Sequence, residues 1–257
     1  MTKILGLGHS HIVAIAKGCY DLQHEGFLLG GAPLTSRFVY LYDPELSPTL
    51  EEEESASSRL NPRLRAIIEE EKPDGIVLSV GGNEHIALSV TQPKERFDFI
   101  LGAEPELDIE AGAVVLPEAA VRETLREKMR PTLATIEAIR KETSAPIVCI
   151  EPPPPLPNSR VMQCPQEFFR KSFDPRRLSQ DVFRYKMWRS QAALYHEICV
   201  KEDILYAPVP AEFIAPSGTL AEVVWGADAS HANELFGRRM IQLAAELFET
   251  RISDGRR

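Results

Sequence analysis

The chain has 257 residues, which is enough for a substantial core and ordinary for one α/β domain. Hydrophobic residues make up 44% and charged residues 26%, as in a typical globular protein. The formal net charge of -9 argues against a nucleic-acid partner, whose phosphates are bound by clustered Lys and Arg side chains. We find neither a signal peptide nor a segment apolar enough to span a membrane, and the four cysteines lack metal-ligand spacing. We therefore expect a cytoplasmic protein with no membrane partner.

Apolar runs alternate with helical patterns along most of the chain. Short runs rich in β-branched residues predict five strands, at residues 3–7, 38–42, 75–80, 146–150 and 204–207. Helical spacing of apolar residues predicts five helices, at residues 12–20, 60–71, 117–143, 183–200 and 232–248. Pro131 either kinks the longest of these helices or divides it into two. The alternation predicts a three-layer α/β/α sandwich with a mainly parallel five-stranded sheet.

No internal repeat or linker marks a second domain, so we predict one domain over residues 1–252 and a disordered tail at 253–257. Two inserts, around residues 84–116 and 151–177, interrupt the alternation. Loops at the carboxyl ends of strands form the binding site in open α/β sheets, so these inserts are either part of the substrate pocket or plain surface loops. The charged and polar segment 51–58 is predicted to be a solvated loop.

Three short stretches, far apart in the chain, contain the parts of a serine-hydrolase active site. They are Gly-His-Ser-His at residues 8–11, Gly-Gly-Asn-Glu at 81–84 and Asp-Ala-Ser-His at 228–231. Acyl transfer needs a nucleophile, oxyanion donors, and a base held by a carboxylate. Ser10 follows the first predicted strand, where a serine either caps the next helix or projects from the top of the sheet as a nucleophile.

The other two stretches lie at the same end of the predicted sheet. Asn83 follows the third strand and either forms a turn or donates its amide N–H to an oxyanion beside Ser10. Asp228 and His231 are three residues apart, which places a carboxylate within reach of an imidazole in a helical turn. Each motif alone has a structural explanation, but their common location favours one catalytic site.

The set resembles the SGNH (GDSL-type) hydrolase family over nearly the whole chain. That family has Gly-x-Ser after strand one, Gly-x-Asn-Asp after strand three and Asp-x-x-His near the C-terminus. The resemblance implies a flavodoxin-like sheet, Ser10 as nucleophile, Ser10 and Asn83 as oxyanion donors, and Asp228 with His231 as the C-terminal pair. It also implies a small-molecule or carbohydrate acyl ester as substrate.

The chain departs from the family pattern at three places. His9 and Glu84 stand where the family usually has Asp, and no glycine between Gly31 and Gly75 matches the second backbone oxyanion donor after strand two. Either an N–H near residues 55–58 replaces that donor, or the oxyanion hole is weaker. The residues that we expect to contact substrate around the motifs are His9, His11, Gly82, Glu84, His85 and Glu151.

A dinucleotide-binding interpretation has some support. Gly6-x-Gly8-x-x-His11 nearly matches the phosphate-binding fingerprint, and Asp43 stands where a ribose-binding acid would lie. The third glycine is replaced by a histidine, however, and Asn83 has no role in this hypothesis.

A metal site is a further hypothesis. Its candidate ligands are His9, His11, His85, Asp228 and His231. The motif order of metallophosphoesterases is absent, so we expect no metal and no organic cofactor. The sequence therefore predicts a serine esterase or acyltransferase that works through an acyl-enzyme on Ser10, and the alternative is a non-catalytic SGNH-like binding protein.

Overall fold

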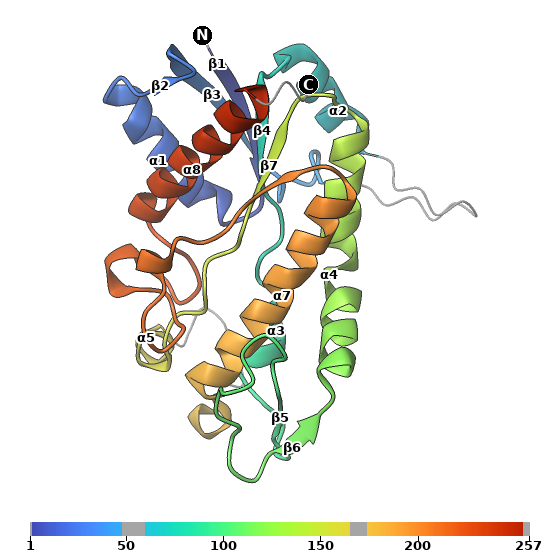
Figure 1. The fold of residues 1–257 in the computed structure, drawn as a ribbon, viewed down its shortest axis with the longest axis vertical. Helices are drawn as coiled ribbons and strands as arrows, with labels where there is room; N and C mark the ends of the chain where they lie inside the picture. Colours follow the sequence, from blue (N-terminus) through green and yellow to red (C-terminus); the bar gives the residue numbers. More distant parts are fainter. Residues whose placement is uncertain (1, 48–59, 165–173, 254–257) are drawn as a thin grey trace, which may run out of the picture.

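The computed structural model describes residues 2–47, 60–164 and 174–253 (Figure 1). The predicted solvated loop at 51–58 and the candidate oxyanion donor near 55–58 lie outside the described residues. The predicted tail also lies outside them, except for Ser253, which ends the last helix.

The central sheet has six strands in the order β2-β3-β1-β4-β7-β8. Its five parallel strands are β1 (Thr2–Gly8), β3 (Ala32–Tyr40), β4 (Gly75–Ser79), β7 (Ile147–Ile150) and β8 (Leu205–Ala207). Counted by their own order in the chain, they lie as 2-1-3-4-5, which is the flavodoxin-like order. At one edge, β2 (Leu28–Leu29) pairs antiparallel with β3. The predicted fold class is confirmed.

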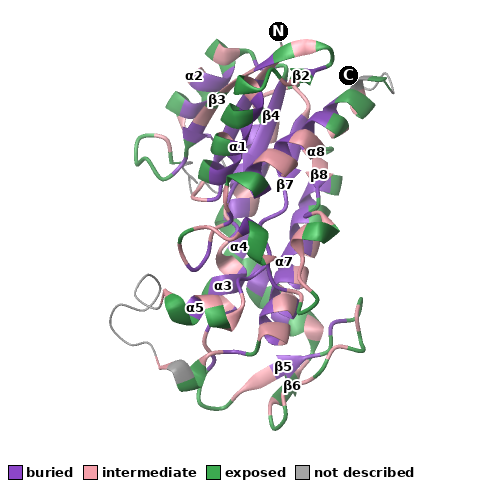
Figure 2. Ribbon diagram, turned by 90° about the vertical axis from the view of Figure 1, so that its left-hand side faces the viewer, coloured by how far each residue is buried: buried purple, intermediate pink, exposed green. Residues whose placement is uncertain are grey.

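Helices cover both faces of this sheet (Figure 1). One face carries α1 (Ile12–His24) and α8 (Glu234–Ser253), and the other carries α2 (Pro62–Glu71), α4 (Glu118–Lys141) and α7 (Asp181–Lys201). Successive residues of β1 point to opposite faces: Ile4 belongs to the core under α1 and α8, whereas Leu5 belongs to the core under the other three helices. Figure 2 shows the central strands β4 and β7 as buried and the outer faces of the helices as exposed.

The backbones of α1 and α8 are in direct contact at two glycines. A Cβ atom at Gly18 would lie 2.0 Å from the backbone nitrogen of Arg238, and one at Gly237 would lie 1.9 Å from the carbonyl oxygen of Ala14. Any side chain at either position would push the helices apart. Since Ser10 precedes α1 and His231 precedes α8, this contact joins the two elements that carry the predicted nucleophile and base.

The inserts have more structure than the sequence predicts. Residues 84–116 contain α3 (Glu84–Ser89) and a small parallel sheet of β5 (Phe97–Phe99) and β6 (Val114–Leu116). The other insert contains α5 (Asn158–Gln163). Two further differences concern the helices: α4 continues through Pro131 as one helix, and α7 is buried on most sides.

The burial of α7 includes charged side chains. Lys186 is fully buried, and its Nζ lies 2.6 Å from Oδ1 of Asp98, which is also fully buried, in the β5–β6 sheet. The same Nζ donates to the carbonyl oxygens of Phe99 and Asp108, at 3.1 and 3.0 Å. This ion pair ties the first insert to α7. The predicted helix at 183–200 is present, and the insert covers a face of it that would otherwise meet solvent.

Candidate active site

The carboxyl ends of β1 and β4 form the centre of the candidate site. β1 is the strand at which the chain order of the sheet reverses, and ligands of open α/β sheets bind at such a switch point. Ser10 follows β1 and Asn83 follows β4. The close approach of the strands requires a glycine at position 8, because a Cβ atom there would lie 2.4 Å from the carbonyl oxygen of Ser79.

Ser10 does not cap the helix that follows it. α1 begins at Ile12, the N-cap position is His11, and no side chain caps the helix. The carbonyl oxygen of Ser10 accepts the N–H of Val13 at 3.3 Å. Among the described residues, its hydroxyl has one hydrogen-bond partner, Nδ2 of Asn83 at 3.5 Å. The hydroxyl is therefore available for chemistry.

Asn83 is held on a turn of unusual backbone shape. Gly81 and Gly82 precede it with φ of +70° and +104°, a region that side chains rarely adopt. The N–H of Gly81 donates to Nδ1 of His9 at 2.9 Å, and the N–H of Gly82 donates to Oε2 of Glu84 at 2.8 Å. Burial lowers the pKa of His9, so its ring stays neutral and Nδ1 can accept this bond. His9 and Glu84 thus hold the turn that carries Asn83.

Asp228 and His231 form a close pair in the loop before α8. Oδ2 of Asp228 lies 2.5 Å from Nδ1 of His231, and its Oδ1 accepts the N–H groups of Ser230 and His231, both at 2.8 Å. Burial raises the pKa of this carboxyl, but the hydrogen bonds from His231 and Ser230 outweigh it and bring the pKa well below its usual range. The ionised carboxylate can therefore hold the imidazole in one orientation.

The second ring nitrogen of His231 is buried and unpaired. Among the described residues, Nε2 of His231 has no hydrogen-bond partner. His231 and Asp228 line a cavity of about 560 Å³ together with Ser10, and the apolar side chains of Val13 and Trp225 form part of its wall. The structure thus brings the predicted base, its carboxylate and the predicted nucleophile to one cavity.

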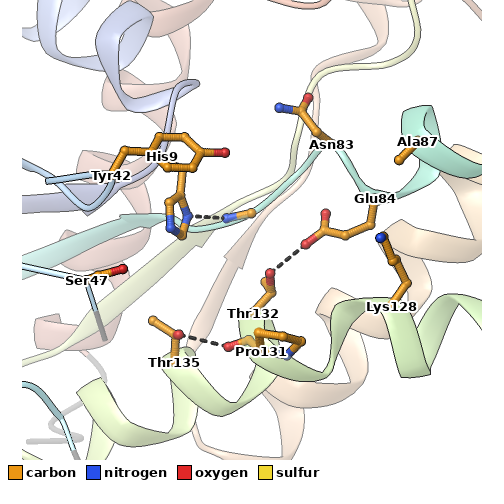
Figure 3. Close-up of a pocket in the computed structure, with 11 residues that line it drawn as sticks. His9, Tyr42, Ser47, Asn83, Glu84, Ala87, Lys128, Pro131, Thr132 and Thr135 are labelled. Atoms are coloured by element: carbon orange, nitrogen blue, oxygen red, sulfur yellow. Dashed lines mark hydrogen bonds between the residues drawn. The ribbon is translucent and has the colours of Figure 1, made fainter. Parts of the chain in front are cut away.

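Asn83 lines a second cavity (Figure 3). It has a volume of about 370 Å³, and eight of the eleven described residues that line it carry a polar group: His9, Tyr42, Ser47, Asn83, Glu84, Lys128, Thr132 and Thr135. Thr132 donates to Oε1 of Glu84 at 2.5 Å. The ring of Tyr42 packs against that of His9, with centroids 4.7 Å apart. The sequence did not reveal four of the residues that line the two cavities, because no motif marks them: Tyr42, Lys128, Thr132 and Trp225.

His11 lies inside the site, although the sequence interpretation placed it against substrate. Its side chain is buried, its Nε2 lies 3.0 Å from Oδ1 of Asn83, and its ring packs against that of His231 with centroids 4.9 Å apart. The residue contacts two members of the candidate machinery. It lines neither the cavity of Ser10 nor that of Figure 3.

His85 and Glu151 do not join the site, so their predicted contact with substrate does not fit the structure. His85 is fully buried under α7, where its backbone N–H donates to Gln191. Glu151 is turned toward the N–H of Val209, at 2.5 Å, and lines a separate cavity of about 270 Å³. Gly82 is buried, so it offers no surface to a substrate, and its contribution to the site is the positive φ that shapes the turn before Asn83.

The part of the chain that the structure describes has neither a metal-binding cluster nor a membrane-spanning helix. No cluster of three or more His, Cys, Asp or Glu side chains is arranged to hold a metal ion within residues 2–47, 60–164 and 174–253. No described helix is both long and apolar enough to cross a membrane.

No family model and no curated protein matches the chain. Solved structures of similar architecture include the periplasmic domain of a lipopolysaccharide acetyltransferase from Salmonella ser. Paratyphi A, with 13% identity over 96% of this chain and 83% of that one and a TM-score of 0.49. A GDSL-like lipase from Bacteroides thetaiotaomicron is 12% identical, with 97% and 88% of the two chains covered and a TM-score of 0.44. A gut microbial diltiazem-metabolizing enzyme is 9% identical over 96% of this chain and 46% of its own, with a TM-score of 0.49. At identities this low and TM-scores below 0.5, the likeness fixes neither the family nor the activity of this chain.

Proposed function

We propose that the protein is a serine-dependent acyl hydrolase or acyltransferase that acts on small or carbohydrate acyl esters. The observation that carries this proposal is the unpaired Nε2 of His231, a residue that lines the same cavity as Ser10, with the carboxylate of Asp228 on the other ring nitrogen. That arrangement supplies a base, its orienting carboxylate and a hydroxyl nucleophile.

The chemistry follows from these positions. Nε2 of His231 takes the proton from Oγ of Ser10 as that oxygen attacks the ester carbonyl carbon, and Asp228 stabilises the resulting imidazolium. The side-chain N–H of Asn83 and the backbone N–H of Ser10 donate to the developing oxyanion. The imidazolium returns the proton to the leaving alcohol, which departs and leaves an acyl group on Ser10. Water or a second alcohol then attacks this ester, and the same proton transfers release the acyl group.

The lining of the two cavities supports a substrate with a polar part. The cavity of Figure 3 presents two threonine hydroxyls, a carboxylate, a lysine and a tyrosine ring within reach of one ligand. Hydroxylated ligands such as sugars offer hydrogen-bond donors and acceptors for such a lining, whereas a long alkyl chain could make no hydrogen bond with it. The separate cavity beside Ser10 combines the apolar side chains of Val13 and Trp225 with polar ones such as Lys17 and Asn233.

Active-site labelling tests this proposal. A fluorophosphonate should attach to Ser10 of the native protein, as peptide mass spectrometry would show, and Ser10→Ala should abolish both labelling and hydrolysis of p-nitrophenyl acetate. Ser217→Ala is a matched control, because Ser217 lies in an exposed loop and its hydroxyl pairs with that of Thr219. The control should label and hydrolyse like the wild type.

The outcomes separate the two candidate functions. Efficient labelling at another serine contradicts the assignment of Ser10. Absence of labelling, together with saturable binding of a sugar ester that is not turned over, favours a non-catalytic binding protein. Comparison of acetyl, butyryl and octanoyl esters, with water or a sugar as acceptor, distinguishes hydrolysis from transfer and defines the acyl group.

A further inference from the structure

His11 occupies a position between the oxyanion donor and the base. Its Nε2 lies 3.0 Å from Oδ1 of Asn83, and its ring packs against that of His231. The side chain is buried and lines neither the cavity of Ser10 nor the cavity of Figure 3, so it is not placed to bind a ligand. Its role must lie in what it does to its neighbours.

The hydrogen bond between His11 and Asn83 has one possible direction. Oδ1 of an asparagine only accepts hydrogen bonds, so Nε2 of His11 must carry the proton and donate. Burial, and then the nearby His231, lower the pKa of His11 to about 3, so the ring is neutral near pH 7 and Nδ1 carries no proton. The structure therefore requires the Nε2–H tautomer.

This bond determines which way the amide of Asn83 faces. With Oδ1 turned to His11, Nδ2 lies 3.5 Å from Oγ of Ser10. Rotation of the amide by half a turn would put its NH₂ group against the N–H of His11, donor against donor, and would turn an acceptor toward the oxyanion. As long as His11 keeps the Nε2–H tautomer, it therefore disfavours the orientation that would repel the transition state.

The backbone around His11 is shaped for this contact. A Cβ atom at Gly82 would lie 2.9 Å from Cδ2 of His11 and 3.1 Å from Cβ of Pro152. The absence of a side chain at Gly82 leaves room for the imidazole against the turn that presents Asn83. A Cβ atom at Gly82 would also lie 3.2 Å from Nε2 of His11, the atom that contacts the amide.

We propose that His11 is a positioning residue that locks the Asn83 amide with its N–H groups toward Ser10, so that the oxyanion donor is set before substrate arrives. This inference rests on the proposed acyl-transfer function. Donors that are fixed in advance stabilise the transition state without reorganisation during the reaction. A loss of the lock should therefore lower kcat and leave KM nearly unchanged.

The test compares two replacements of His11. His11→Phe keeps a ring of similar size without an N–H, and His11→Gln keeps a donor at about the position of Nε2. We expect kcat for p-nitrophenyl acetate to fall about 10- to 100-fold in His11→Phe, since loss of an oxyanion donor costs about 10²–10³. His11→Gln should recover most of this loss. His196→Phe is a matched control, because His196 is exposed and packs on Tyr206, away from Ser10.

A double variant separates positioning from general structural damage. Once Asn83→Ala has removed the amide, His11→Phe has nothing left to orient, so the double variant should be no slower than Asn83→Ala alone. Long-range ¹H–¹⁵N spectra of the wild type give a readout without turnover. They should show His11 as the neutral Nε2–H tautomer from pH 7 to pH 5, and the side-chain amide signal of Asn83 should shift in His11→Phe.

Each outcome decides a different question. The positioning role would be overturned by any of three results. These are a double variant whose loss of kcat is the product of the two single losses, an effect of His11→Phe on KM alone, or an Nδ1–H tautomer of His11. If Ser10→Ala and Asn83→Ala are inactive but His11→Phe keeps full activity, this inference alone fails. If Ser10→Ala keeps full activity, the proposed function fails and the role of His11 in it falls too.

Discussion

Replacing Asp228 with Asn changes one carboxylate oxygen into an amide nitrogen and keeps the shape of the side chain. The amide oxygen can still accept the backbone N–H groups of Ser230 and His231, as Oδ1 does now at 2.8 Å. The new NH₂ group then takes the place of Oδ2, which lies 2.5 Å from Nδ1 of His231. Because this group donates, Nδ1 must accept, and the ring proton moves to Nε2.

This change of tautomer blocks the base. Nε2 of His231 can no longer take the proton of Ser10, although every heavy atom stays near its place. The same substitution in a Ser-His-Asp protease, a worked case of this effect, lowers kcat about 10⁴-fold. A factor of 10⁴ corresponds to about 5.4 kcal/mol in the activation free energy. We expect a loss of this order for Asp228→Asn.

The assay measures kcat for p-nitrophenyl acetate and the rate of fluorophosphonate labelling, with a thermal melt to verify folding. Asp74→Asn is the matched control, since Oδ2 of Asp74 also accepts a backbone N–H, from Lys3 at 2.8 Å, but at the opposite end of the sheet. The control should retain wild-type rates. An Asp228→Asn protein that is folded and within about tenfold of the wild-type rate would refute the tautomer argument.

Two further expectations concern stability and the turn. Lys186→Met leaves the carboxylate of Asp98 buried without its cation, so the free energy of unfolding in urea should fall by about 3–5 kcal/mol. Adding Asp98→Asn should restore part of this free energy. No loss in Lys186→Met would mean that the ion pair is hydrated. Gly82→Ala strains a backbone with φ of +104° and forces a Cβ against His11, so kcat should fall about 10²-fold, as for a misplacement near 1 Å. Gly26→Ala has a similar φ, +77°, but open space around it, so it should lose only about 1–2 kcal/mol of stability and no activity. Equal activity of the two alanine variants would contradict the importance of the His11 contact.

The fold was predictable where each element has a strong pattern of its own. The strands at residues 3–7 and 75–80 are continuous apolar runs and match β1 and β4 closely. β3 begins six residues earlier than predicted, because Ala32–Arg37 is mixed in polarity and includes a proline. Its hydrogen bonds come from pairing along the whole of β1, from Thr2 with Leu34 to Gly8 with Tyr40, and such long-range pairing is not visible in local sequence. β5 and β6, with three residues each, are too short to show a period.

The candidate site was predictable to the level of which elements meet, and less so for where side chains point. Ser10 and Asn83 follow neighbouring parallel strands, so topology alone brings them together. His85 is one helical residue beyond Glu84, and this offset turns its ring into the core under α7. The contact of His11 with Asn83 depends on the missing side chain at Gly82. Such fits depend on three-dimensional packing and leave no periodic signal.

The glycine contact between α1 and α8 has a mechanical consequence for the proposed catalysis. Gly18 and Gly237 let the two backbones touch, and no flexible side chain cushions the helices at these points. The separation of Ser10 and His231, which precede these helices, therefore depends on a close backbone contact that lies about two helical turns away along each chain segment. Substitutions on the exposed faces of α1 and α8 should leave the spacing of Ser10 and His231 unchanged. A single methyl group at either glycine would move the helices apart and lower the rate of the reaction, although every residue that touches substrate stays the same.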